Sequence, residues 1–93
     1  MKEPSRKLPR PFKFPWGGGM IVEEVSIRCE YHEPCIQLLE FDEGYEEVRF
    51  CYYDLDGRFQ RSPMLISADE MKRLSRGLKK CPRLRKALSS LAT

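Results

Sequence analysis

Side chains that commonly carry catalysis are scarce or scattered in this sequence. There is one histidine, His32, and there is no Cys-x-x-Cys pair, glycine-rich phosphate loop or serine-centred nucleophile elbow. The many carboxylates fall at expected turns and strand ends, where solvated acids normally lie, rather than beside a nucleophile and an oriented base. We therefore expect a protein that is not an enzyme and has no small-molecule substrate.

Long hydrophobic runs are also missing. Runs such as Met64-Leu65-Ile66 are far shorter than the ~20 residues of a membrane helix. The basic N-terminus is not followed by the apolar run of a secretory signal, so we expect no membrane contact and a reducing, cytoplasmic setting. A chain of 93 residues that is 41% hydrophobic and 33% charged predicts one small domain with a modest core.

The four cysteines lack the spacing of a typical metal site. Cys29-x-x-His32-x-x-Cys35 brackets an expected turn, and Cys51 would have to supply a fourth zinc ligand. Cys81 belongs to an apolar helix stripe, and a free cysteine is a common small core residue. A Cys29–Cys35 disulfide does not suit a reducing compartment. We expect no metal and no cofactor, with a zinc module kept as the third functional alternative.

Charge, in contrast, is abundant and segregated. The net charge is +4 over residues 1–22, −9 over residues 23–57 and +8 over residues 58–93. Such poles favour either an anionic partner at the basic pole or pairing between opposite poles.

Residues 1–19 predict a flexible basic arm, because they contain four prolines and end in Gly17-Gly18-Gly19. Phe12, Phe14 and Trp16 are interleaved with basic side chains there. That combination suits a grip on a single nucleic-acid strand by stacking and phosphate contact. The alternatives are aromatics that dock onto the domain, or a disordered leader.

Residues 20–93 predict one α+β domain that begins with a four-stranded antiparallel meander. Alternation or β-compatible composition marks strands at Val22–Tyr31, Cys35–Phe41, Glu46–Tyr53 and Arg58–Ile66. The short connections between them favour antiparallel pairing. Asp54-Leu55-Asp56-Gly57 predicts a tight turn that closes through a left-handed glycine.

Within the third strand, alternation places Val48, Phe50 and Tyr52 on one face, which we expect to be the core. Arg49, Cys51 and Tyr53 then lie on the other face, so Tyr53 is the expected exposed ring unless a bulge shifts the register.

A C-terminal helix should follow the meander. Ser67-Ala68-Asp69-Glu70 has the pattern of a capping box, and an apolar stripe runs from Met71 to Leu91. Pro82 either kinks this helix or begins a second one as its first residue. The opposite face is basic, which is either a solvated surface or a contact for an anion.

From Glu46 to Leu91 the order of features resembles the positive-cofactor-four type of transcriptional coactivator and its Pur-alpha and Whirly relatives. The carriers are Tyr52-Tyr53, the turn Asp54–Gly57, the strand Arg58-Phe59-Gln60-Arg61, the run Leu65-Ile66-Ser67 and the Leu74/Leu78 stripe. The resemblance implies a curved four-stranded sheet, a homodimer built partly through helices, a basic N-terminal tail and binding of single-stranded nucleic acid. It also implies that Tyr52 stacks on a base and that Arg58, Gln60 and Arg61 lie near phosphates.

The leading hypothesis is therefore a small, non-enzymatic protein that binds single-stranded DNA or RNA, in a transcription-related role and as a homodimer. The competing hypothesis is a protein–protein assembly module in which an acidic sheet meets a basic helix, without nucleic acid. The candidate nucleic-acid-binding residues are Arg49, Tyr52, Tyr53, Arg58, Gln60, Arg61, Lys72, Arg76, Lys79 and Lys80.

Overall fold

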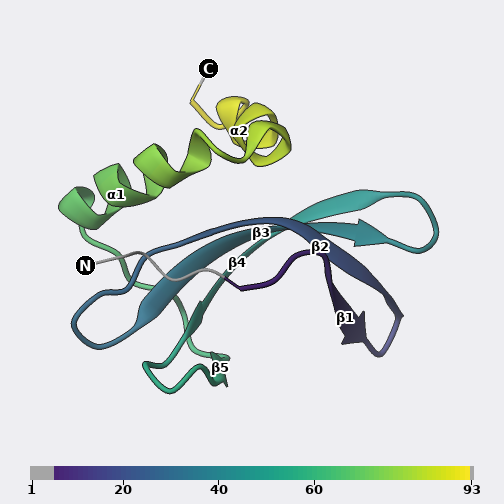
Figure 1. The fold of residues 1–93 in the computed structure, drawn as a ribbon, viewed down its shortest axis with the longest axis horizontal. Helices are drawn as coiled ribbons and strands as arrows, with labels where there is room; N and C mark the ends of the chain where they lie inside the picture. The colour runs from purple at the N-terminus through teal and green to yellow at the C-terminus, as the bar shows by residue number, and fades with distance from the viewer. Residues whose placement is uncertain (1–5, 93) are drawn as a thin grey trace.

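A computed structural model describes residues 6–92, which form a five-stranded antiparallel sheet followed by two helices (Figure 1). The spatial order of the strands is their order in the chain, so the sheet is a meander. The α+β class and the antiparallel meander are confirmed, whereas the four expected strands are one too few. Of the two outcomes expected at Pro82, the structure has the second helix. The elements are β1 (Arg10–Phe14), β2 (Gly17–Ser26), β3 (Glu33–Phe41), β4 (Glu46–Tyr53), β5 (Phe59–Gln60), α1 (Ala68–Leu78) and α2 (Pro82–Ser89).

The extra strand comes from the segment predicted to be a flexible arm. Residues 10–14 pair with residues 17–21 as an antiparallel hairpin, and the triple glycine begins β2 instead of forming a joint. A Cβ atom on Gly19 would lie 2.0 Å from the Glu40 carbonyl oxygen, so the close approach of β2 to β3 at this position requires glycine. Prolines are tolerated because β1 is an edge strand. The first five residues of the predicted arm lie outside the described residues.

A bulge in β2 decides which side chains face which side of the sheet. Ile21 pairs with Leu39 and Glu23 with Leu38, which leaves Val22 as the extra residue. Glu23 therefore faces α2, where its carboxylate accepts hydrogen bonds from the backbone N–H groups of Leu84 at 2.8 Å and Arg83 at 3.3 Å. Glu24 faces the opposite side of the sheet.

Three of the four predicted strands have limits that differ from the sequence prediction. The strand expected at Val22–Tyr31 ends at Ser26, and Tyr31 is exposed in the loop that follows. The second strand begins at Glu33 and includes Pro34. The Pro34 carbonyl accepts a hydrogen bond from the Ile27 N–H at 3.2 Å, so the proline nitrogen also faces the chain just after the end of β2. The strand expected at Arg58–Ile66 is only β5, residues 59–60.

The turn before β5 has the predicted chemistry. Gly57 has a φ of +87°, in the left-handed region that glycine enters without strain. Asp54 Oδ1 accepts hydrogen bonds from the N–H groups of Asp56 at 2.9 Å and Arg58 at 2.8 Å. These bonds hold the basic residues after the turn next to the end of β4.

The two helices cover one side of the sheet, here called the helix face. Ser67 and Glu70 form both bonds of the predicted capping box, and the chain breaks into two helices with Pro82 as the first residue of α2. The helices pack the middle of their apolar stripe against β2 and β3 (Figure 1), whereas Met71 and Leu91 at its two ends are exposed. The buried residues of this core are Val25, Ile27, Ile36, Leu38, Leu74, Cys81 and Leu84.

The other side of the sheet, here called the concave face, is enclosed by the curl of the sheet itself. β1 and β5 both turn away from the helices (Figure 1), so the first and last strands approach each other on this side. The register places the following side chains on it: Arg10, Phe12, Phe14, Ile21, Glu24, Glu33, Cys35, Gln37, Leu39, Phe41, Glu47, Arg49, Cys51, Tyr53 and Phe59.

The concave face corrects the burial expected for β4. Tyr53, the expected exposed ring, is only 9% exposed, and Cys51 is 5% exposed. Phe50, expected in the core, is 52% exposed on the helix face, because α1 and α2 pack over β2 and β3 and leave β4 largely uncovered. The alternation was predicted correctly, and the assignment of the buried face was wrong.

Candidate nucleic-acid interface

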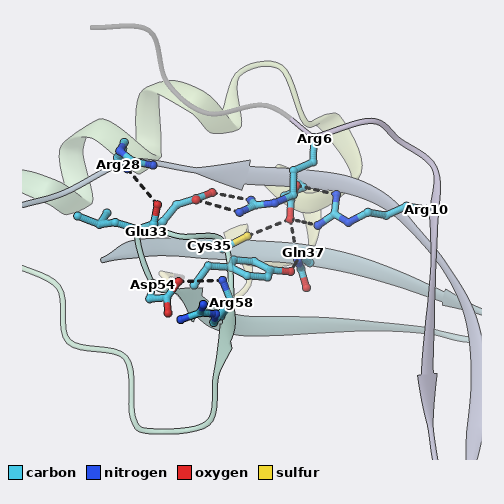
Figure 2. Close-up of polar contacts among 11 residues, drawn as sticks. Arg6, Arg10, Arg28, Glu33, Cys35, Gln37, Asp54 and Arg58 are labelled. Atoms are coloured by element: carbon cyan, nitrogen blue, oxygen red, sulfur yellow. Dashed lines mark hydrogen bonds and ion pairs between the residues drawn. The ribbon is translucent and has the colours of Figure 1, made fainter. Parts of the chain in front are cut away.

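A buried polar network occupies the centre of the concave face (Figure 2). Glu24, on β2, accepts two hydrogen bonds from the Arg10 guanidinium, at 2.9 and 2.5 Å. It also accepts hydrogen bonds from Gln37 Nε2 at 2.6 Å and from Cys35 Sγ at 3.1 Å. Every donor comes from β1 or β3, so the network joins three strands through one carboxylate.

A second ion pair lies beside the first. Arg6 donates two hydrogen bonds to Glu33, at 2.5 and 2.9 Å, and its guanidinium carbon lies 4.1 Å from the centre of the Tyr53 ring. The Tyr53 hydroxyl accepts from Gln37 Nε2 at 3.1 Å. The segment before β1 thus covers the Tyr53 ring. Glu24 and Glu33, two carboxylates of the acidic residues 23–57, are each neutralised by an arginine of the same molecule.

The protonation of Glu24 reflects this environment. Burial raises the pKa of the Glu24 carboxyl, but the hydrogen bonds from Arg10, Gln37 and Cys35 outweigh it and hold the pKa below its ordinary value of 4.5. The same Arg10–Glu24 hydrogen bonds raise the pKa of Arg10. The pair therefore remains fully charged at neutral pH.

The cysteines lie differently from the zinc hypothesis. Cys35 is directly opposite Cys51 across β3 and β4 on the concave face, whereas Cys29 packs against the helix-face core. The hydrogen bond between the Cys35 and Cys51 sulfurs raises the pKa of Cys35 and lowers that of Cys51. Within residues 6–92 no three His, Cys, Asp or Glu side chains are grouped to hold a metal ion.

A row of aromatic rings around one guanidinium forms the outer part of the concave face. Trp16 stacks on Phe14 with ring centres 4.7 Å apart. The Arg49 guanidinium lies 5.7 Å from the Phe14 ring centre and 5.0 Å from that of Phe59, and Phe59 meets Tyr53 edge to face. Trp16 is 67% exposed and Phe59 is 45% exposed. Trp16, Phe14, Arg49 and Phe59 are called the aromatic–arginine row below.

Arg49 is the fixed point of this row. Its Nε donates to Gln37 Oε1 at 2.7 Å, and Gln37 is fully buried in the Glu24 network. Since β1 and β5 each bring one phenyl ring to the same guanidinium, the row spans the whole curl of the sheet. Cation–π contacts of this kind contribute about 0.5–2 kcal/mol each.

The structure divides the residues predicted from sequence into separate groups. Arg49, Tyr53 and Phe59 share the concave face, whereas Gln60 pairs with Tyr52 and therefore faces the opposite side. Arg58 and Arg61 lie directly before and after β5. Gln60 donates to Asp54 Oδ2 at 3.3 Å and to the Arg58 carbonyl oxygen at 3.0 Å. The turn is also tied to the loop after β2 by a hydrogen bond from Arg28 to the Leu55 carbonyl oxygen, at 3.1 Å (Figure 2).

The other predicted residues lie away from the row. Tyr52 is on the helix face of β4, where its ring meets His32 edge to face at 5.6 Å. Lys72, Arg76, Lys79 and Lys80 belong to α1 and the link to α2, on the opposite side of the sheet. One surface therefore cannot include all the predicted residues.

Sequence reasoning placed Phe14 and Trp16 in a separate arm and gave Phe59 no role. The interleaving of aromatic and basic residues was the available signal for the first two. The contact between Phe14 and Arg49 depends on the curl of the sheet, which no local pattern encodes, whereas Phe59 reaches Arg49 across the β4–β5 hairpin.

Comparison with protein-family models, with curated proteins and with solved structures found no match. No helix within residues 6–92 is long and apolar enough to cross a membrane.

Proposed function

We propose that this chain is a small, non-enzymatic protein that binds single-stranded nucleic acid on its concave face. The observation that carries the proposal is the aromatic–arginine row, in which exposed rings from β5 and the β1–β2 turn flank a guanidinium fixed from behind. Unpaired bases stack on such rings, at about 1–3 kcal/mol per base. Trp16 and Phe59 are the stacking residues in this proposal.

The charges next to the row support an anionic ligand. Arg58 and Arg61 are both exposed, one on each side of β5, and Arg58 also lies 3.9 Å from the Asp56 carboxylate. Glu24 and Glu33 would otherwise repel phosphates, but each is paired with an arginine behind the row. Glu47 is the remaining exposed carboxylate of this face in the described chain.

The ligand should be single-stranded because the row offers ring faces rather than a protruding helix. Duplex bases are stacked on one another and present only their edges in the grooves. A flexible single strand, by contrast, can turn its bases toward Trp16 and Phe59 while its phosphates approach Arg58 and Arg61. Binding of this kind tolerates many sequences, since every base has a stacking face.

The test is a titration of a fluorescently labelled single-stranded oligonucleotide, followed by anisotropy at low salt. Phe59→Ala should weaken binding about 5- to 100-fold, the equivalent of one lost stacking contact. Tyr31→Ala is the matched control, because Tyr31 is 79% exposed in the loop after β2 and should bind normally. Absence of binding to both DNA and RNA oligonucleotides would refute the proposal.

The assembly-module alternative is favoured by a different surface. Arg76, Lys79, Lys80, Arg85 and Lys86 are exposed on the helical side and form no ion pair with another residue in the range 6–92. An acidic protein could bind there through charge complementarity, which chiefly sets orientation and association rate. Replacing Lys79 and Lys80 by glutamine would abolish this interaction, whereas stacking on the concave face would persist.

A further inference from the structure

The two edges of the sheet are protected to different degrees. β1 forms one edge, and the segment around it contains Pro9, Pro11 and Pro15, which have no N–H group to offer another strand. At the other edge, β5 pairs only with Tyr52 and Tyr53 of β4. Among residues 6–92 no strand covers the rest of β4, and this stretch contains no proline. The free edge of β4 is defined here as residues 46–51.

The hydrogen bonds at the ends of β4 show which backbone groups point outward. Phe41 N–H donates to the Tyr45 carbonyl, so odd-numbered residues of β4 direct their backbone groups toward β3. Asp54 N–H donates to the Arg58 carbonyl, which puts the even-numbered residues on the β5 side. The backbone groups of Glu46, Val48 and Phe50 are therefore directed outward along the free edge.

We propose that two copies of this chain pair antiparallel through the free edges of β4, with Val48 opposite Val48, and so form one continuous ten-stranded sheet. In such a pair, residues whose backbone groups point outward must lie opposite outward-pointing residues of the other copy. Only a few alignments of the two strands satisfy this, and each is shifted from the next by two residues. Neighbouring registers place Glu47 opposite Glu47 or Arg49 opposite Arg49, and like charges directly opposite are destabilising.

The Val48-centred register instead places Glu47 of each copy opposite Arg49 of the other, on the concave face. Both side chains remain accessible, since Glu47 is exposed and Arg49 is partly exposed in the monomer. Two symmetrical ion pairs then flank the two-fold axis, as an isologous interface requires. The acidic turn after β3 of one copy also comes next to the end of β5 in the other, where Arg61 is exposed.

This inference goes beyond the proposed function, because it concerns the protein without nucleic acid, although Arg49 and Arg61 take part in both. The interface consists mainly of one short strand pair, which is small for a stable complex, so the dimer should dissociate on dilution. Sedimentation equilibrium over a wide range of protein concentration should fit a monomer–dimer equilibrium.

Charge variants test the register. Glu47→Lys places lysine opposite Arg49, and Arg49→Glu places glutamate opposite Glu47, so each variant alone should dimerise at least about tenfold more weakly. Mixing the two variants restores opposite charges at both positions, and the mixture should form a heterodimer. Glu30→Lys is the control with the same change of charge, since Glu30 is exposed in the loop after β2.

A backbone variant tests the edge itself and does not depend on the folding of Arg49→Glu. Phe50→Pro removes an outward N–H that the described chain does not use, and should therefore abolish dimerisation, whereas Phe50→Ala keeps the N–H and should retain most of it. In the dimer, hydrogen exchange at the Val48 and Phe50 amides should slow as protein concentration rises. A chain that stays monomeric at millimolar concentration, or a dimer that Glu47→Lys and Phe50→Pro leave unchanged, would overturn the proposal.

Discussion

The helix face and the concave face of this sheet are both covered, but by different means. On the helix face, α1 and α2 supply leucines to an apolar core around Ile36 and Leu38. On the concave face, the covering comes from the curl of the sheet and the segment before β1, and its centre is a charged network around Glu24 and Gln37. The first arrangement stabilises by removing apolar surface from water, the second by paired charges and hydrogen bonds.

Under the proposed function, the helix face supplies most of the stability and the concave face supplies the binding surface. An apolar core under two helices leaves little for a polymer ligand to contact, whereas the concave face combines fixed polar groups with exposed rings. Buried polar networks hold their members in defined positions when every group is satisfied. Among the described residues, no buried side-chain nitrogen or oxygen lacks a hydrogen-bond partner. The network can therefore hold Arg49 in place through hydrogen bonds, without a large apolar core on the concave face.

The largest effect is expected from Leu84→Ala on the helix face. Leu84 is completely buried, and removing its side chain should lower the free energy of unfolding by about 2–5 kcal/mol. Urea denaturation measures the change, with Leu91→Ala as the control because Leu91 is 76% exposed. Oligonucleotide affinity of the folded fraction should stay the same, and a matching loss of affinity would show that the two faces are not separable.

A smaller loss of stability is expected from Glu24→Gln on the concave face. The variant leaves Arg10 without its carboxylate, and because Arg10 still reaches water the cost should be about 2 kcal/mol at neutral pH. The lowered pKa of Glu24 stabilises the fold above about pH 4.5, and this contribution is lost as pH falls through the folded-state value. Urea denaturation of wild type should therefore show a fall in stability below about pH 4.5 that is shallower in Glu24→Gln. Equal pH dependence in the two proteins would contradict the role given to this pair.

The smallest effect is expected from the cations at the edge of the concave face. Replacing Arg61 by glutamine should weaken binding of all oligonucleotide sequences similarly and reduce the slope of log affinity against log salt by about 0.7, the loss of one phosphate contact on a single strand. Arg85→Gln on α2 removes the same charge from the other side of the molecule and should leave the slope unchanged. Equal effects of both variants would point to a general charge effect instead of a defined site.

The parts of the fold that local chemistry controls were predictable from the sequence. The bounds of β4, the left-handed Gly57 and the capping box at Ser67 each depend on neighbouring residues alone. β1 was missed because proline and glycine usually argue against strands, and only the edge position and the close crossing at Gly19 make them compatible with one.

The buried face of β4 could not be predicted in the same way. Alternation separates Phe50 from Tyr53 but does not say which side receives the better cover, and here the segment before β1 covers Tyr53 while the helices leave Phe50 exposed. For the same reason only part of the candidate site was found. Arg49 was identified from its strand, but its contact with Phe14 depends on the curl that brings β1 back over β4, two strands away from its own partner.

The fluorescence of Trp16 tests the central claim most directly, because it is the single tryptophan of the chain and lies at the end of the aromatic–arginine row. Titration with an unlabelled single-stranded oligonucleotide at low salt should quench its emission in a saturable way, since a base stacks on the exposed indole. Added salt should reverse the quenching as phosphate contacts weaken. Binding detected by an independent method without any change in Trp16 emission would contradict the assignment of the concave face as the nucleic-acid interface.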